Sequence, residues 1–382
     1  MACIVKLPSE QSVGVLSFTT QERDRLILAD EALRNSIMSL KGRWLIGLHH
    51  NWHDYQFKYD PLFDFSMAGE EDLREINGQH VPLVAMDACN FVPNCFAPGQ
   101  SEKFWDILYV ARAVQFKRIP EFFQCIRALY DQGHKYRVLF ICPIPPYARK
   151  ERKTVFYDIR NVYDNMFSDS EQSLFTLLTI DYRYPFPFDL PTLSHFYRSS
   201  RLFVHTADDE RRCRVAAYAW ASGNPVVGMD CVAGLLPEAA RTAPYFYSVK
   251  SYQEFPERII TAISDISAKK HWDQTLMNQL FAEEQSVDTF HKSIARIAES
   301  KNLPYDMSRI SRKNLSIRLG RHHLGEDGPN SLGSTLTEFI QFITDRAVDE
   351  IEQYIHLPDP ERALPRAKNT AKKNVFGIFA KR

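Results

Sequence analysis

Apolar segments of strand length alternate with segments of helical spacing through the middle of the chain. Such strands, apolar along their whole length, are typical of a parallel sheet that helices cover on both faces. One helical segment, IPEFFQCIRALYDQG at 119–133, ends at Gly133, a residue that favours a helix C-terminus. The sequence therefore predicts an α/β fold built from βαβ units. The strand-like segments are DILYVARA (106–113), YRVLFICPIP (136–145), LFTLLTID (174–181), RLFVHTA (201–207) and PVVGM (225–229).

The parts of the chain on either side of this alternation differ from it. Residues 1–102 contain few elements, among them a buried strand at 43–50, and predict a reduced N-terminal α/β domain. Residues 103–301 form the larger Rossmann-like domain. Residues 302–382 are polar and interrupted, with one helical stretch at 336–355, and predict a C-terminal helical extension with a basic tail.

Charge and cysteine content narrow the class of protein. Lys and Arg total 47 and Asp and Glu total 47, so no basic excess exists to neutralise nucleic-acid phosphates over the whole surface. The seven cysteines form no C-x-x-C pair, which is typical of reduced thiols in a cytosolic protein. With no secretory signal and no apolar run of membrane-spanning length in the sequence, we expect a cytoplasmic protein without a nucleic-acid partner.

Cations follow the first strand of the alternating region. Arg112 and Lys117 lie five residues apart where that strand turns into a loop. Open parallel sheets bind ligands at the carboxyl ends of their strands, and an Arg fork with a Lys point charge suits a pyrophosphate. The alternative is an ordinary solvated basic loop.

Acids follow a later strand, where Asp208, Asp209 and Glu210 precede a helix expected over 210–223. Acids at a helix N-terminus are stabilised by its dipole, which is the structural interpretation. The functional interpretation is that Glu210 faces a ligand held at the same edge. A third segment, DCVAGLLPEA at 230–239, contributes a weaker signal.

Together these segments resemble the nucleotide-sugar domain of retaining GT-B glycosyltransferases, especially glycosyltransferase family four. Ala111-Arg112 and Lys117 match the family's strand ending in Gly-Arg and its later Lys. Glu210 matches the first acid of the E-x7-E motif, and AYAWASGNPVVG (217–228) matches the string EAMASGKPVV. AGLLPE (233–238) matches a Gly-rich turn followed by Glu.

The resemblance implies a GT-B-like fold, with two Rossmann-type domains and a cleft between them. It implies that Arg112 and Lys117 hold the diphosphate of a UDP- or GDP-sugar and that Glu210 lies near the donor sugar, with no metal or other cofactor. Tyr218 stands where the family has its second acid, which binds ribose hydroxyls. The donor pocket implied by the resemblance is lined by Tyr218, Gly234, Leu235 and Glu238.

A weaker resemblance involves the histidines of RWLIGLHHNWHDYQF (43–57), which is similar to the family's strand ending in a His that faces the donor. His49 and His50 are nearly equal candidates for that catalytic position. Two alternatives remain: a zinc site that includes His53, and histidines that are simply packed or solvated.

The C-terminal sequence LPRAKNTAKKNVFGIFAKR (364–382) is basic and contains no acid. It suits a disordered solubilising tail, a peripheral contact with an anionic membrane surface, or docking onto a partner protein. The expected activity is retaining transfer of a hexose to a glycan or lipid-linked acceptor. The alternatives are a catalytically degenerate subunit that scaffolds an active partner, and a sugar-nucleotide epimerase.

Overall fold

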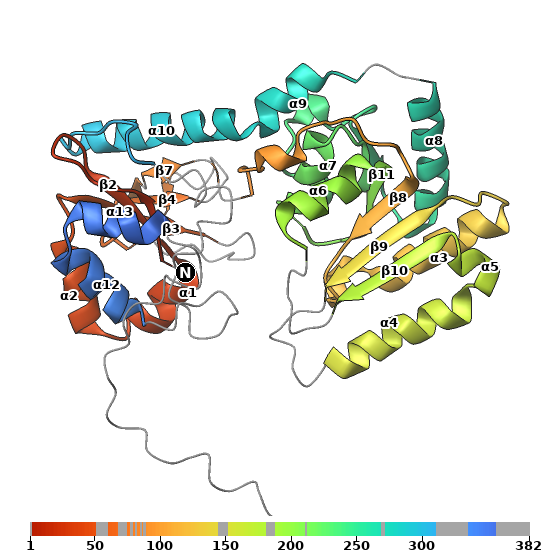
Figure 1. Ribbon diagram of the computed structural model, residues 1–382, viewed down its shortest axis with the longest axis horizontal. Helices are drawn as coiled ribbons and strands as arrows, with labels where there is room; N and C mark the ends of the chain where they lie inside the picture. Colours follow the sequence, from red (N-terminus) through yellow and green to blue (C-terminus); the bar gives the residue numbers. More distant parts are fainter. Residues whose placement is uncertain are drawn as a thin grey trace, which may run out of the picture. The chain divides into compact units, whose positions relative to one another are not determined.

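The computed structural model divides into two compact units, Met1–Ala85 with His291–Arg382, and Met86–Phe290 (Figure 1). The domain limits expected at 102 and 301 therefore differ from the observed ones. The described residues of the expected C-terminal extension, 302–310 and 335–356, group with the first unit. The structure describes residues 2–50, 60–67, 75–76, 79–80, 82–84, 86, 89–143, 152–180, 188–210, 212–268, 272–310 and 335–356.

The second unit contains a six-stranded parallel sheet with the spatial order β10-β9-β8-β11-β12-β13. From β8 the chain adds β9 and then β10 on one side. It then crosses back to add β11, β12 and β13 on the other side of β8. This is the doubly wound arrangement of Rossmann-type folds. The strands are β8 (Trp105–Val110), β9 (Val138–Pro143), β10 (Phe175–Ile180), β11 (Ser200–His205), β12 (Val226–Met229) and β13 (Phe246–Val249).

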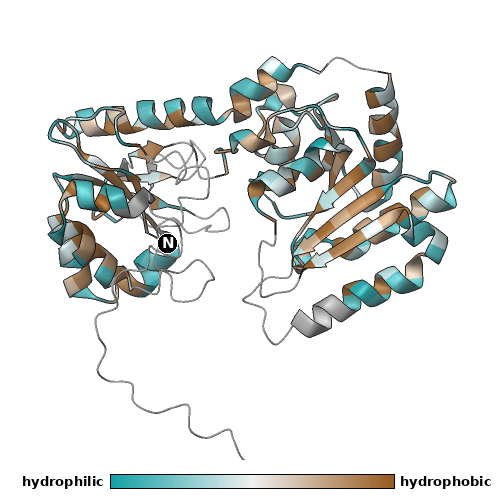
Figure 2. Ribbon diagram, viewed as in Figure 1, coloured by the Kyte–Doolittle hydropathy of each residue, from teal (hydrophilic) through white to brown (hydrophobic). Residues whose placement is uncertain are grey.

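Helices cover both faces of this sheet because alternate strand residues are apolar on both sides. In β8, Ile107 and Tyr109 join the core under α3, α4 and α8, whereas Leu108 and Val110 join the core under α6, α7 and α9. Figure 2 shows the hydrophobic colouring of the central strands β8 and β9. The helices of this unit are α3 (Ile119–Asp131), α4 (Arg152–Met166), α5 (Asp169–Gln172), α6 (Leu190–Arg198), α7 (Arg214–Ala221), α8 (Phe255–Ser267) and α9 (Gln274–Phe281). The next helix, α10 (Glu283–Ser300), begins in this unit and ends in the first.

Local signals set the helix limits. Gly133 follows α3 with φ of 86°, and Gly223 follows α7 with φ of 79°, a region that favours glycine. The N-terminus of α7 differs from the expectation, since Cys213 is the N-cap and the helix begins at Arg214. Glu210 therefore precedes the helix and does not occupy its first turn.

The first unit has a smaller sheet, ordered β1-β2-β3-β4-β7, in which β1 is antiparallel and the other strands are parallel. The α/β class, with a largely parallel sheet in each unit, is confirmed. The strands are β1 (Cys3–Lys6), β2 (Gly14–Thr19), β3 (Trp44–His49), β4 (Phe65–Met67) and β7 (Leu83–Val84), beside a separate hairpin of β5 (Glu75–Ile76) and β6 (Gln79–His80).

The apolar pattern of residues 23–40 suits a single helix, but the structure has an interrupted one. It consists of α1 (Thr20–Glu22), a π-helical turn (Arg23–Ile27) and α2 (Glu31–Ser39). Asp30 ends the first part and starts the second, because its carboxylate accepts a hydrogen bond from the Leu33 amide at 3.0 Å. This is an N-cap, which satisfies an amide that the helix itself leaves unpaired.

The C-terminal helices α12 (Leu336–Asp345) and α13 (Val348–His356) complete the core of the first unit. The expected helix at 336–355 is broken between them. The amide of Leu7 also donates to the Arg309 carbonyl at 3.1 Å. The residues contributed by the two helices to the core that holds Leu33 and Ile37 are Leu336, Phe339, Ile340, Ile343 and Ile351.

We expect Ile343→Ala to destabilise the protein, because Ile343 is fully buried in this core and its truncation leaves a cavity. The free energy of unfolding should fall by about 2–5 kcal/mol. Thr344→Ala, at the neighbouring exposed position, is the control and should change it by about 0.5 kcal/mol or less. Urea denaturation measures both variants. Equal stabilities would contradict the assignment of α12 to this core.

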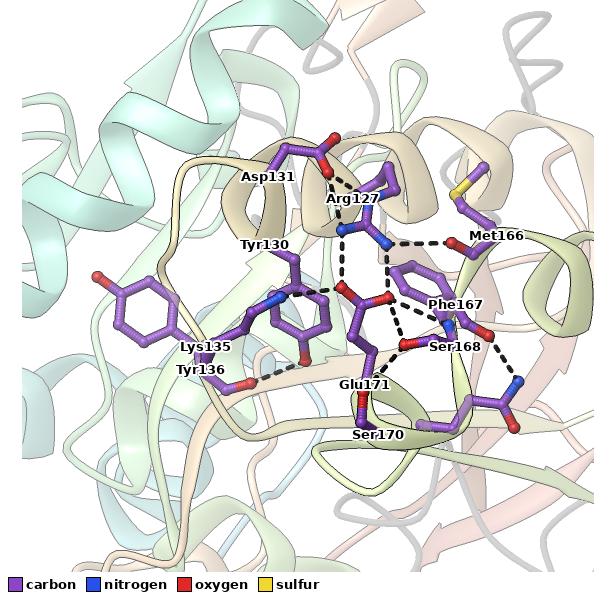
Figure 3. A network of polar contacts seen from close by, with 11 residues as sticks. Arg127, Tyr130, Asp131, Lys135, Tyr136, Met166, Phe167, Ser168, Ser170 and Glu171 are labelled. Carbon is purple, nitrogen blue, oxygen red and sulfur yellow. Dashed lines mark hydrogen bonds and ion pairs between the residues drawn. The ribbon is translucent and has the colours of Figure 1, made fainter.

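A polar network on the second unit joins α3 to α5. The Arg127 guanidinium donates to both carboxylate oxygens of Glu171, at 2.7 and 2.8 Å, and Lys135 Nζ donates to the same carboxylate at 2.9 Å. Figure 3 shows both cations pointing toward Glu171. These contacts, Arg127 foremost, hold the pKa of Glu171 well below its usual range.

The lowered pKa of Glu171 predicts a pH dependence of stability. The network should stabilise the fold above the unfolded-state pKa of about 4.3 and lose this effect as the pH falls through the lower folded pKa. At neutral pH, Glu171→Gln should lower the free energy of unfolding by about 1 kcal/mol, and this difference should shrink in acid. Asp164→Asn, in the exposed pair with Arg160, is the control. A difference that stays constant down to strongly acid pH would refute the assignment.

Candidate functional site

The switch point of the second sheet lies between β8 and β11, the strands from which the chain builds outward in opposite directions. After β8 the chain enters α3 on one face, and after β11 it enters α7 on the other. The two intervening loops, 111–118 and 206–213, leave the same carboxyl edge of the sheet. In doubly wound folds, ligands bind at this position.

A buried cluster of charge joins these loops. Lys117 Nζ forms an ion pair with the Glu210 carboxylate and lies 3.1 Å from Nε2 of His205. Glu210 Oε2 in turn lies 3.6 Å from the same His205 nitrogen. The side chains of Lys117, Glu210 and His205 are 11%, 8% and 0% exposed. One ammonium group is therefore held by a carboxylate and an imidazole away from bulk water.

Burial determines the protonation of this cluster. Burial lowers the pKa of His205 well below its usual value, and the charge of Lys117 lowers it further. The imidazole is therefore neutral at physiological pH, and its Nε2 accepts from the Lys117 ammonium. Burial also lowers the pKa of Lys117, and the charge of Arg112 adds to that effect. Arg112 is half-buried and lies five residues before Lys117 on the same loop.

Hydroxyl groups fix the backbone of the first loop. The hydroxyls of Tyr109 and Thr206 both donate to the Lys117 carbonyl, at 2.5 and 2.9 Å. The next residue, Arg118, has a left-handed φ of 52° and forms an ion pair with Asp208 in the second loop at 2.5 Å. Because these contacts link the two loops directly, the position of Lys117 depends on both strands.

A thiol adjoins the charged cluster. Cys213, the N-cap residue of α7, is fully buried, and one potential ligand atom each from His205, Glu210 and Cys213 lies within 4.8 Å of the others. Burial raises the pKa of Cys213 to about 11, so the thiol is protonated at neutral pH. In the part of the chain that the structure describes, these three residues are the group whose spacing suits a metal ion.

Of the residues that the sequence singled out, the structure pairs Lys117 with Glu210, and Arg112 lies five residues before Lys117 on the same loop. Residues 234–238 follow β12, the strand beside β11. Glu238 is the exposed first residue of a 3-10 turn, Glu238–Ala240, and no hydrogen bond joins its carboxylate to the described part of the cluster. Gly234 has an ordinary φ of −56°, and Leu235 is half-buried. Their assignment to the donor pocket stays a prediction.

Tyr218 lies in the core that covers one face of the sheet. Its ring stacks on Phe96 with the centroids 3.9 Å apart and meets Tyr197 edge-on at 6.1 Å. The side chain is 5% exposed. The aromatic ring thus contributes packing that a carboxylate at this position would not, and the expected contact with a ribose stays a prediction.

His49 and His50 belong to the first unit, at the carboxyl end of β3, and both are buried. Burial lowers the pKa of His50 to about 3, with Arg23 and His49 lowering it further, so this ring is neutral. Their catalytic role stays a prediction. His53 and the basic tail 364–382 lie outside the described residues.

Several residues of the cluster were not expected from the sequence. His205 is the last residue of β11, directly across from the loop that carries Lys117. The sequence signal that could have pointed to His205 was its place at the end of an apolar strand, as at His49. No sequence signal pointed to Cys213, Tyr109 or Thr206. Each is an ordinary core or strand-end residue, and its contacts with the cluster are evident only once the two loops are side by side.

Comparisons with known proteins give structural matches only, because no family model and no curated protein sequence matches the chain. A glycosyltransferase from Rickettsia africae ESF-5 is 9% identical, with a TM-score of 0.46 over 66% of this chain and 70% of that one. The pneumococcal O-GlcNAc transferase GtfA, solved with UDP and GlcNAc, is 12% identical, with a TM-score of 0.47 over 69% and 54%. TarM is 11% identical, with a TM-score of 0.49 over 69% and 58%.

The chain therefore spans little more than half the length of GtfA and TarM. TM-scores below 0.5 are too low to assign a family or an activity. Within the described residues, no helix is both long enough and apolar enough to cross a lipid bilayer.

A double-mutant cycle tests the Lys117–Glu210 pair. Glu210→Gln should lower the free energy of unfolding by about 3–5 kcal/mol, because it leaves a buried ammonium without its counter-charge. Adding Lys117→Met should recover part of that loss, with a coupling of at least about 1 kcal/mol. Urea denaturation of the wild type, both single variants and the double variant gives the coupling. Additive effects would show that the two groups do not interact.

Proposed function

We propose that the chain is a retaining GT-B glycosyltransferase, which moves a hexose from a nucleoside diphosphate sugar to a glycan or lipid-linked acceptor without a metal cofactor. The observation that supports this best is the buried ion pair of Lys117 with Glu210 at the switch point of a doubly wound sheet, with Arg112 on the same loop as Lys117. All three match motif positions of the resembling family, although they come from two loops about 90 residues apart in the sequence.

The charges of the cluster suit a diphosphate. Lys117 is already compensated by Glu210 in the absence of a ligand, so the site does not leave a buried ammonium unpaired. A diphosphate would supply oxygens that replace those of Glu210 around Lys117, while Arg112 offers a second cation. Glu210, once released, would be able to accept hydrogen bonds from sugar hydroxyls.

In the proposed reaction, the bond between the anomeric carbon and the diphosphate oxygen breaks as an acceptor hydroxyl bonds to the same face of the sugar. The hydroxyl proton passes to a phosphate oxygen of the donor, and a nucleoside diphosphate leaves. Negative charge grows on that diphosphate during bond breaking. Fixed cations such as Arg112 and Lys117 would stabilise it most in the transition state, which lowers the barrier.

The remaining sequence-based roles complete this proposal. Tyr218 would donate one hydrogen bond to the nucleotide in place of a carboxylate, and Gly234, Leu235 and Glu238 would line the sugar and phosphate pocket. A hydroxyl donor cannot accept two hydrogen bonds as a carboxylate does. Weaker nucleotide binding is the expected consequence, and it favours the degenerate scaffolding subunit as the second candidate function.

Arg112→Ala should lower turnover by about 100-fold or more, because it removes one cation from the leaving diphosphate. The assay offers a panel of UDP- and GDP-sugars with candidate acceptors and follows release of the nucleoside diphosphate. Arg137→Ala is the matched control, since Arg137 is exposed and precedes β9 at the opposite edge of the sheet, over the Phe104 ring.

Calorimetry with UDP and GDP separates the candidate functions. A transferase binds one of them, and Arg112→Ala weakens that binding. Absence of binding at millimolar nucleotide would refute the transferase and leave the scaffolding subunit. Conversion of the donor sugar without any acceptor would instead identify an epimerase.

A further inference from the structure

We propose that His205, Glu210 and Cys213 form a binding site for a zinc-like divalent cation, for which the Lys117 ammonium is the internal competitor. The three ligand side chains come from the end of β11, the loop that follows it and the N-cap of α7. All three are buried, and one potential ligand atom from each lies within 4.8 Å of the others. No metal is assigned to the transfer reaction itself.

The kinds of ligand atom define the class of ion. An imidazole nitrogen, a carboxylate oxygen and a thiolate sulfur together suit Zn²⁺ and similar borderline ions, whereas Mg²⁺ and Ca²⁺ prefer oxygen alone. Metal–ligand distances of about 2.0–2.3 Å place tetrahedral ligand atoms about 3.5 Å apart. The observed spacing therefore needs a closure of roughly 1 Å, and three protein ligands leave a fourth position for water.

The position of the Lys117 side chain shows where this cluster holds a cation. Its ammonium is paired with Glu210 and lies 3.1 Å from His205 Nε2, so it uses two of the three proposed ligands. The same lone pairs cannot serve an ammonium and a metal ion together. A bound ion would therefore displace Lys117 from the site.

The exchange balances in charge and protons. Before binding, the site holds one ammonium, one carboxylate and a protonated thiol. A divalent ion ionises the Cys213 thiol, whose proton goes to solvent, and its two positive charges are balanced by the thiolate and the Glu210 carboxylate. The His205 ring remains neutral, and its Nδ1 has no hydrogen-bond partner among the described residues, so binding breaks no second bond there.

The consequence for activity rests on the proposed function. Lys117 and Glu210 are the groups that the donor diphosphate would meet, so an ion bound between His205, Glu210 and Cys213 would exclude the donor. The ion would then act as an inhibitor that competes with the nucleotide sugar. Zinc binding itself depends only on the geometry of the three ligands and requires no donor.

Titration of the full-length protein with Co²⁺ tests the site, because Co²⁺ adopts zinc geometries and absorbs visibly. We expect a thiolate-to-cobalt charge-transfer band that Zn²⁺ removes. Cys213→Ser should abolish the band and weaken binding by at least about 100-fold, since changes beyond the ligands alone cost about 10- to 100-fold. Cys125→Ser, at a buried cysteine of α3, is the control and should keep the band.

Unlike Cys213→Ser, the Lys117→Met variant should bind the metal more tightly, an effect that a general loss of structure would not produce. Removing the competing ammonium should tighten Co²⁺ binding by about tenfold or more. Circular dichroism and urea denaturation show whether each variant is folded. Absence of the band in both the wild type and Lys117→Met, or equal affinities of these two proteins, would overturn the proposal.

A separate measurement keeps this proposal distinct from the proposed function. UDP and GDP binding is measured with and without Zn²⁺. Competition supports both proposals, whereas cobalt binding in a protein that binds neither nucleotide supports the metal site and refutes the transferase. Nucleotide binding that Zn²⁺ leaves unchanged would refute the inhibitory role.

Discussion

The buried ion pair between Lys117 and Glu210 links the two halves of the larger sheet. It joins the loop after β8 to the loop after β11, and the neutral His205 completes the surroundings of the ammonium. Buried charges are tolerated only when they are paired and hydrogen-bonded, so the positions of both loops are mutually dependent. The hydroxyls of Tyr109 and Thr206 add to this dependence by holding the Lys117 carbonyl.

Periodicity predicts the larger unit well because its strands are continuous apolar runs with helices of ordinary length between them. The first residues of the helices and the breaks within helices were harder to predict from the sequence. Cys213 is not a common N-cap residue, so α7 could not be located from its first residue. The interruption at Asp30 depends on one side-chain hydrogen bond to Leu33, which competes locally with a continuous helix.

The candidate site could be predicted only in part. Arg112, Lys117 and Glu210 carry charges at strand ends, and charge at such positions is visible in a sequence. The roles of His205 and Cys213 depend on the adjacency of β8 and β11, two strands about 90 residues apart, and no local pattern encodes that pairing. His49 and His50 of the first unit are the opposite case. The sequence singled them out as candidates, but it did not indicate which residues surround them.

The shared core of the first unit has a consequence for synthesis at the ribosome. Strands β1 to β4 emerge early, but the side chains of α12 that complete their core are made only after residues 86–290. The second unit is continuous in the chain, so it can mature as soon as it has emerged. The first unit has to wait with an open apolar face, and nascent chains that stop before residue 336 would depend on chaperones.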